Sequence, residues 1–393
     1  RHSGRPVPLV RRPGGREDAR VHLTTRDLNR ATLARQLLLR REPLPVAEAV
    51  RRVVALQAQE AASPYLALWN RVDPFDPAEL DAAFADHRVV KATLMRLTLH
   101  AVAAEDYPAF QAAVLRSLRG GRLGDARFLD TGLTPADADA LVPHLTRFTA
   151  RPRNRPEVEA MLAERVGAEH PRLWWALRHY APIWHAPTGG PWSFGVRAAY
   201  LAAGVRPDWA DQDGALRTLV RRYLAGFGPA TVADVAQFAM VPRARVRAAV
   251  AELGDELETL PGSALLDVPG APRPGGDTPA PPRLLGMWDS ILLGYADRGR
   301  VIPEAHRKVV IRNNGDVLPT LLVDGFVAGV WRPVEGGIEA TAFEPLPAEA
   351  WDGLAAEARR LVPFLAGRDP GVYGRYAHWW AKLPPGDTRV LTG

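Results

Sequence analysis

The sequence contains no cysteine, and its lysines are confined to three positions, Lys91, Lys308 and Lys382. Without thiols the chain forms no disulfide, thiolate zinc site or iron–sulfur cluster, and it has no cysteine nucleophile. The absence of cysteine also fits a reducing compartment. So few lysines argue against an enzyme that works through a lysine Schiff base.

Several other common signals are missing. No apolar run reaches transmembrane length. Residues 1–20 are basic and rich in glycine and proline, but they lack the apolar stretch of a signal peptide, so we expect a disordered basic arm in a cytoplasmic protein. There is no Walker loop, no GxGxxG after a strand and no HExxH, and the ten histidines are scattered. We therefore expect neither a cofactor nor a metal.

The chain has an excess of positive charge, and nearly all of it comes from arginine. The net charge is +6 and the sequence pI is about 9.9. This balance favours a polyanionic partner, and the guanidinium fork pairs well with phosphates and guanine edges. A genome of high GC content favours the same residue, so the arginine excess by itself leaves the partner open.

With 393 residues the chain is too long for one ordinary core, so several domains are expected. In the first, residues 21–130, Thr24 or Thr25 caps a helix, a second helix follows Pro45 as far as Gln57-Ala58-Gln59, and Pro64 and Pro77 open two more. Val89 to Ala103 is β-rich and indicates a strand. Short helices followed by strands are typical of a winged helix.

A second and a third unit of the same kind are predicted. In residues 131–205, helices begin at Pro156 and Leu173, and Pro187 to Gly195 forms a turn or wing. Residues 206–270 carry the clearest pattern. It consists of three helices and two strands, at Leu216–Leu224, Thr231–Met240, Arg243–Leu253, Glu256–Leu260 and Ala264–Val268. This is the order of a helix-turn-helix with a wing, although a helical hairpin without a DNA role gives a similar pattern.

After a proline- and glycine-rich linker at 270–282, the pattern turns to β in residues 283–393. Asn314-Gly315 lies between two β-rich runs, Lys308–Ile311 and Val317–Val323, which predicts a hairpin. Further strands are expected at Phe326–Trp331 and Glu339–Phe343, and a helix at Leu354–Leu365. The predicted fold class is α+β, mainly α, with tandem winged-helix domains and a β-rich C-terminal module.

Few residues carry visible chemistry. On a regular helix Gln57 and Gln59 would point to opposite sides, so they converge only if the helix ends or distorts there. Glu60 is a candidate general base, but a glutamate at a helix end is usually solvated. Four tryptophans, Trp174, Trp175, Trp184 and Trp192, are candidates for stacking on bases, although such clusters more often form core.

Three stretches resemble the bacterial winged-helix DNA glycosylases of AlkZ/AlkX type. They are ALQAQEAASPYLALWNR (55–71), LMRLTLHAVAAEDY (94–107) and GMWDSILLGYADRGRVIPEAHRKVV (286–310). The resemblance implies three tandem winged helices around a concave face and a catalytic Gln-x-Gln motif at Gln57 and Gln59, the form of the AlkZ self-resistance branch. It also implies DNA-binding residues in the second stretch and on a basic hairpin near the third, namely Arg96, Thr98, His100, Arg298, His306, Arg307, Lys308 and Arg312.

The activity that the resemblance implies is excision of bulky N7-alkylated purines and unhooking of interstrand crosslinks, for repair or for self-resistance to an alkylating metabolite. Alkylation at N7 makes the base a neutral leaving group, so the enzyme only needs to stabilise an oxocarbenium-like sugar and position water. A glutamine carbonyl is a poor base but orients water. We therefore expect a monofunctional glycosylase, monomeric and nucleoid-associated, whose partner is double-stranded DNA.

Two rival hypotheses come from other features. A transcriptional regulator would use the helix-turn-helix at 231–253, although no dimerisation helix is visible. A protein that sequesters the alkylating metabolite would use the tryptophan-rich middle of the chain.

Overall fold

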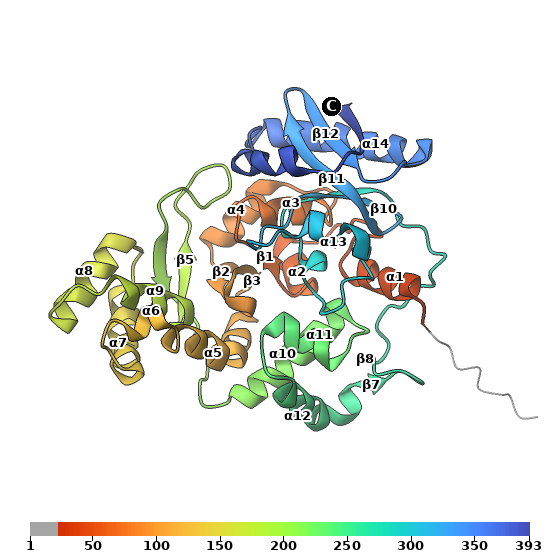
Figure 1. Cartoon of the computed structure of the whole chain (residues 1–393). Helices are drawn as coiled ribbons and strands as arrows, with labels where there is room; N and C mark the ends of the chain where they lie inside the picture. Colours follow the sequence, from red (N-terminus) through yellow and green to blue (C-terminus); the bar gives the residue numbers. More distant parts are fainter. Residues whose placement is uncertain (1–22) are drawn as a thin grey trace, which may run out of the picture.

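The computed structural model describes residues 23–393, so the basic arm expected at 1–20 lies outside the described residues. Helices and strands alternate along the chain, and Figure 1 shows the C-terminal strands and α14 above the helices of the rest of the molecule. No helix in residues 23–393 combines the length and the apolar character that crossing a membrane needs.

The N-terminal unit begins with a helix that its own sequence caps. Thr24 caps α1, as expected, and forms a reciprocal capping box with Asp27. The elements that follow are α1 (Thr25–Arg35), α2 (Val46–Arg52), β1 (Leu56–Gln57), α3 (Ser63–Trp69), α4 (Pro77–Ala85), β2 (Val89–Thr93), η1 (Met95–Leu97) and β3 (Leu99–Ala103). The helices expected at Pro64 and Pro77 are thereby confirmed.

Two expectations in this unit were wrong in detail. The helix after Pro45 ends at Arg52 and does not reach Gln57, because Val54 has a φ of 75°, outside the helical region, and Leu56–Gln57 then pairs with β3. The strand expected over 89–103 is two antiparallel strands. The chain reverses at Arg96 and Leu97, whose φ angles are 55° and 59°.

One six-stranded sheet runs through the first two expected units. Its order is β1-β3-β2-β5-β6-β4, and β2 meets β5 where Lys91 lies opposite His185. The additional elements are α5 (Tyr107–Leu123), α6 (Ala126–Leu129), α7 (Pro135–Phe148), β4 (Arg153–Asn154), α8 (Arg155–Val166), α9 (Pro171–Tyr180), β5 (Ile183–Ala186) and β6 (Ala199–Ala202). In Figure 1, α6, α7, α8 and α9 gather at the outer end of this sheet.

The third unit follows the predicted order of elements. It consists of α10 (Gln212–Phe227), α11 (Val232–Ala239), α12 (Arg243–Leu253), η2 (Gly254–Glu256), β7 (Glu258–Thr259) and β8 (Leu266–Asp267), and the two strands pair antiparallel. A fully buried ion pair joins it to α1, because Arg35 Nη1 lies 2.6 Å from Asp267 Oδ1 and Arg35 Nη2 lies 2.8 Å from Oδ2.

The C-terminal module is β-rich, as predicted. A five-stranded sheet has the order β13-β12-β11-β10-β9 and is accompanied by α14. The elements are β9 (Arg283–Leu285), η3 (Ser290–Leu292), α13 (Glu304–Val310), β10 (Thr320–Val323), β11 (Phe326–Val334), β12 (Gly337–Ala342), α14 (Ala348–Ala366), η4 (Gly374–Lys382) and β13 (Asp387–Thr392).

The strand expected at Lys308–Ile311 was wrong, and of the predicted hairpin only a short antiparallel turn around Asn314-Gly315 is present. Pro303 starts helix α13, which runs to Val310, and Lys308 lies on this helix. Across the turn, Ile311 bridges to Val317, and backbone hydrogen bonds join Arg312 N to Asp316 O and Leu318 N to Val310 O at 2.8 and 3.0 Å. The β-branched residues at 309–311 favour a strand, but the good helix formers that follow Pro303 and the burial of Val310 favour the helix instead.

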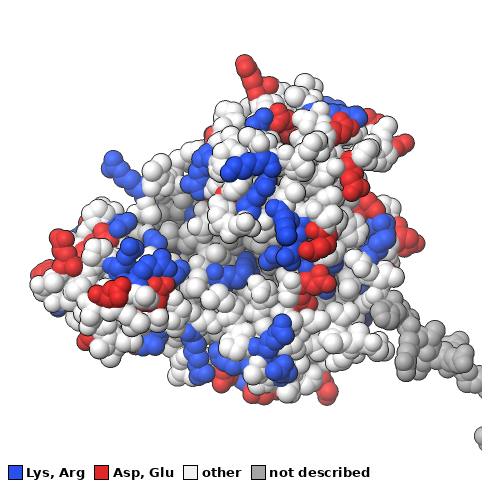
Figure 2. All heavy atoms as spheres, viewed as in Figure 1, with Lys and Arg blue, Asp and Glu red and all other residues white. Residues whose placement is uncertain are grey.

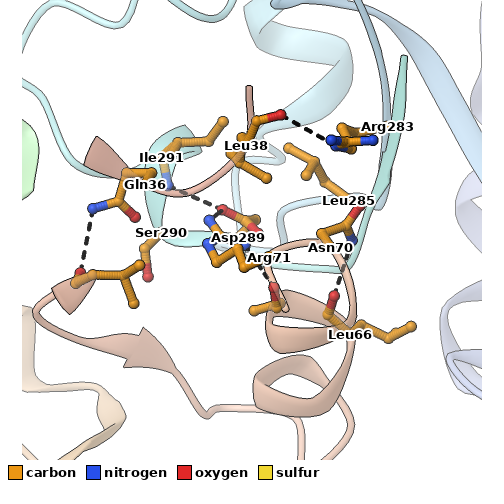
Figure 3. Close-up of polar contacts among 12 residues, drawn as sticks. Gln36, Leu38, Leu66, Asn70, Arg71, Arg283, Leu285, Asp289, Ser290 and Ile291 are labelled. Atoms are coloured by element: carbon orange, nitrogen blue, oxygen red, sulfur yellow. Dashed lines mark hydrogen bonds and ion pairs between the residues drawn. The ribbon is translucent and has the colours of Figure 1, made fainter. Parts of the chain in front are cut away.

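A buried polar network joins the C-terminal block to the N-terminal unit (Figure 3). Arg71 and Asp289, both fully buried, form two ion-pair contacts at 2.7 and 2.8 Å. Beside them, Ser290 Oγ donates to the carbonyl oxygen of Ala55 at 2.7 Å. Because Ala55 directly precedes β1, this bond helps to fix the position of Gln57.

Candidate active site

Gln57 lies on β1 opposite His100 of β3 and is only 4% exposed. Its side-chain oxygen Oε1 accepts a hydrogen bond from Arg96 Nη2 at 3.2 Å, and Thr98 Oγ1 lies 3.5 Å from the same oxygen. The amide of Gln57 is therefore held in one orientation by residues of the turn that joins β2 to β3.

His100 holds the Arg96 side chain that donates to Gln57. Its Nδ1 donates to the carbonyl oxygen of Thr98 at 3.1 Å, so Nε2 is free to accept from Arg96 Nη2 at 3.3 Å. Burial and the neighbouring Arg96 lower the pKa of His100 to about 3. The imidazole is thus neutral at physiological pH, and its tautomer matches both bonds.

Arg96 connects the Gln57 site to the third unit. Its Nη1 donates to the carbonyl oxygen of Phe238 on α11 at 3.0 Å, and its guanidinium lies 5.3 Å from the centre of the Phe238 ring. Burial and the nearby Arg298 lower its pKa to about 10. Arg96 still carries its charge at neutral pH, beside the side-chain oxygen Oε1 of Gln57.

Gln59 is exposed, in the bend between β1 and α3. Because α2 ends at Arg52, no helix forces the two glutamines to opposite sides, and the condition for their convergence is met. One glutamine is anchored and the other is open to solvent.

Glu60 is not a solvated helix-end residue. Its carboxylate accepts a hydrogen bond from the Tyr376 hydroxyl at 2.8 Å and forms an ion pair with Arg375, both on η4. In the same segment, the hydroxyl groups of Tyr373 and Ser63 lie 3.2 Å apart. Glu60 and Arg375 are 315 residues apart in sequence, so no local signal revealed this contact.

The remaining basic residues expected to bind DNA come from α13 and its flanks. Arg298 is half-buried, and burial together with Arg307 lowers its pKa, as Arg298 in turn lowers that of Arg96. Lys308 is exposed on α13. His306 lies 4.9 Å from the Phe343 ring, and Arg312 lies 4.9 Å from that of Trp379. Figure 2 shows blue side chains over this part of the surface.

A groove of about 460 Å³ adjoins Arg96 on the side of α11 and α12. Its walls come from α11, from the N-terminal end of α12 and from the loop before Arg298, and include Gln237, Met240, Arg243 and Ala296. The groove therefore lies between two of the segments for which DNA contacts were expected.

The tryptophan-rich middle of the chain is mostly core. Trp174, Trp184 and Trp192 are each at most 5% exposed, and Trp184 packs edge-on against Tyr107. They are not available to stack on bases or to bind a free metabolite, whereas Trp175 is half-buried. Within residues 23–393 no group of histidine and acidic side chains has the arrangement of a metal site.

Comparison with known proteins settles the family. The sequence model of the family described as "DNA glycosylase AlkZ-like" matches residues 50–364. This chain belongs to the AlkZ-like DNA glycosylase family. As an AlkZ-like protein it is a DNA glycosylase, and the transcriptional regulator is not favoured.

Relatives of this AlkZ-like glycosylase have been described from Streptomyces sahachiroi. A protein named interstrand DNA cross-link repair glycosylase is 26% identical, and the alignment covers 84% of this chain and 94% of the relative. The solved structure of Streptomyces sahachiroi DNA glycosylase AlkZ superposes with a TM-score of 0.72 at 23% identity, covering 88% of this chain and 96% of that one. The fold of the two proteins is therefore shared.

Proposed function

We propose that this AlkZ-like glycosylase removes bulky N7-alkylated purines from double-stranded DNA and unhooks interstrand crosslinks, leaving an abasic site. The relative named for crosslink repair supports this substrate class. A cationic purine leaves readily as a neutral base, so the protein has to supply positioned water and stabilisation of the sugar rather than a strong acid.

The observation that carries the proposal is the anchored amide of Gln57. Arg96 occupies one lone pair of Oε1 and polarises the amide, which makes the Nε2 hydrogens better donors. In our proposal Nε2 of Gln57 holds the oxygen of the attacking water, and the exposed Gln59 accepts one of its hydrogens through Oε1. Water held by two amides attacks C1′ as the bond to the base breaks. The electron pair of that bond leaves with the purine, which departs neutral, and the proton released by the water passes to solvent.

Lys91 is poorly placed for a Schiff-base route. In the register of the sheet, Gln57 lies opposite His100, whereas Lys91 lies opposite Ala101, so Lys91 points to the other face from Gln57. This geometry supports a monofunctional enzyme that does not cleave the DNA backbone.

We further propose that three winged-helix units present DNA to this site, with boundaries near 21–130, 131–205 and 206–270. The order α10-α11-α12-β7-β8 supports the third unit most directly. In this proposal Arg298, Arg307, Lys308 and Arg312 contact phosphates, His306 lies beside them, and Arg96, Thr98 and His100 act at the lesion through Gln57.

The decisive experiment is base release from duplex DNA that carries a defined N7-alkylguanine adduct. We compare the wild type with Gln57→Ala/Gln59→Ala and with Gln212→Ala, a control that removes a glutamine from α10. The proposal is supported if the wild type and the control release the base and the double variant does not. No release by the wild type, together with tight binding to one undamaged sequence, points to the regulator.

A further inference from the structure

A second basic cluster, with side chains from α5, α6 and α9, lies around Trp175 where the first two expected units meet. The guanidinium carbons of Arg122 and Arg127 each lie 4.6 Å from the centre of the Trp175 ring. Arg178 stands on the same helix, α9, one turn after Trp175. We refer to Arg122, Arg127 and Arg178 as the α9 cluster.

The positive charge of the α9 cluster is only partly neutralised. Arg127 is paired with Asp125 at 2.8 Å. The Nε atoms of Arg122 and Arg178 are buried and have no hydrogen-bond partner among the described residues. Burial and repulsion by the other two arginines lower the pKa of Arg122. Such mutual repulsion is unfavourable unless an anion binds between the guanidinium groups.

Next to the α9 cluster, the sheet brings together titratable groups of β5 and β2. His185 of β5 lies opposite Lys91 of β2, and its pKa is lowered to about 3 by burial, by Lys91 and by Arg178. The charge of Glu60 raises the pKa of Lys91, against the larger lowering by burial. At neutral pH His185 is therefore uncharged and Lys91 is buried, so the exposed positive charge of this region is that of the α9 cluster itself.

Figure 2 shows the surface of this part of the molecule. Blue side chains gather over α6 and α9, on the same face as those over α13, and the surface between them is hollowed. Two separate groups of cations on one face match a polyanion with regularly spaced charges better than they match a single small anion.

From these observations we propose that the α9 cluster binds phosphates of the duplex flanking the lesion. The contact would be separate from the one around Arg298 and α13. This inference rests on the proposed function for the location of the lesion, but not for the binding itself. The guanidinium fork, stacked on Trp175, suits the phosphate backbone and carries no sequence information.

The test is DNA binding at several salt concentrations by Arg122→Ala/Arg178→Ala, with duplexes of about one and about three helical turns. We expect the dissociation constant for the long duplex to rise about 10-fold and the slope of log K against log salt to fall by about 2, with a smaller change for the short duplex. Arg122→Lys/Arg178→Lys keeps the charge and should retain the slope.

The matched control is Arg155→Ala/Arg165→Ala, which removes the same charge from the neighbouring helix α8. The inference is overturned if the control loses as much affinity as the test variant. It is also overturned if the test variant unfolds thermally like the wild type and its salt slope is unchanged. If Arg122→Ala/Arg178→Ala unfolds, Arg122→Gln/Arg178→Gln replaces it. Excision at saturating protein is measured in parallel, so an inactive wild type that still shows the slope change would refute the proposed function and leave the phosphate contact standing.

Discussion

Arg96 Nη2 lies 3.2 Å from Gln57 Oε1, although 39 residues separate the two in sequence. The half-buried guanidinium of Arg96 therefore donates to the side-chain oxygen of the first glutamine of the motif. The two glutamines are not equivalent, because Gln57 is anchored and Gln59 is exposed.

Replacing Arg96 with methionine should slow base release while leaving DNA binding largely intact. A charge-assisted hydrogen bond contributes about 1.5–3 kcal/mol, so we expect a decrease of roughly 10- to 100-fold in the single-turnover rate. Arg96→Lys should recover part of the rate. An unchanged rate in Arg96→Met would show that the orientation of Gln57 does not matter.

Substitution of Glu60 tests the contact with the C-terminal segment. Glu60→Gln removes the charge partner of Arg375 but keeps the size of the side chain, and it should lower the single-turnover rate by a few-fold to 10-fold because the loop after Gln59 loosens. Tyr376→Phe should have a smaller effect in the same direction. Arg389→Ala, which removes a surface ion pair, is the control. Equal rates in all variants would contradict a positioning role.

The buried imidazole of His100 should make the protein sensitive to acid. Its folded pKa, about 3, lies below the ordinary value of 6.5, so its contribution to stability is complete above pH 6.5 and is lost as the pH falls toward 3. Between these values the wild type should lose about 1 kcal/mol of unfolding free energy per pH unit more than His100→Gln. Urea unfolding at several pH values measures this, with the exposed His378→Gln as control. If the unfolding free energy of the wild type and of His100→Gln depends on pH in the same way, the neutral buried imidazole does not contribute to acid sensitivity.

Lys91 should make the stability of the protein depend on pH in the alkaline range. Burial lowers its pKa to about 8 from 10.5, so the unfolded chain binds the extra proton and stability rises as the pH increases from 8 to 10.5. Lys91→Met should raise the unfolding free energy at neutral pH by about 2 kcal/mol and flatten that rise. It should still release the base, and borohydride should trap no adduct with DNA in either protein. A trapped adduct that Lys91→Met abolishes would disprove the monofunctional mechanism.

The buried pair in Figure 3 should be the most sensitive point of the interface between the N-terminal unit and the C-terminal module. Asp289→Asn leaves the charge of Arg71 buried without its partner, and we expect a loss of about 3–5 kcal/mol in chemical denaturation. Glu159→Gln, at an exposed ion pair on α8, should cost less than about 1 kcal/mol. Similar losses in the two variants would contradict the importance of burial.

Signals that act within a few residues predicted much of this fold. Thr24 caps α1, Pro64 and Pro77 begin α3 and α4, and the helix-turn-helix at 231–253 has the predicted elements, because caps, prolines and the apolar period depend on the local backbone alone. The resemblance of three ordered stretches also gave the family correctly.

The tertiary structure decided what depends on distant partners. Gln57 is a strand residue because β3 pairs with it, and the run after Pro303 is helical although its β-branched end favours a strand. No local pattern could show that Arg96 orients Gln57 or that Arg375 reaches Glu60. Contacts between residues far apart in the chain form only when the whole fold brings them together, whereas the sequence determines directly only the elements that a few neighbouring residues can stabilise.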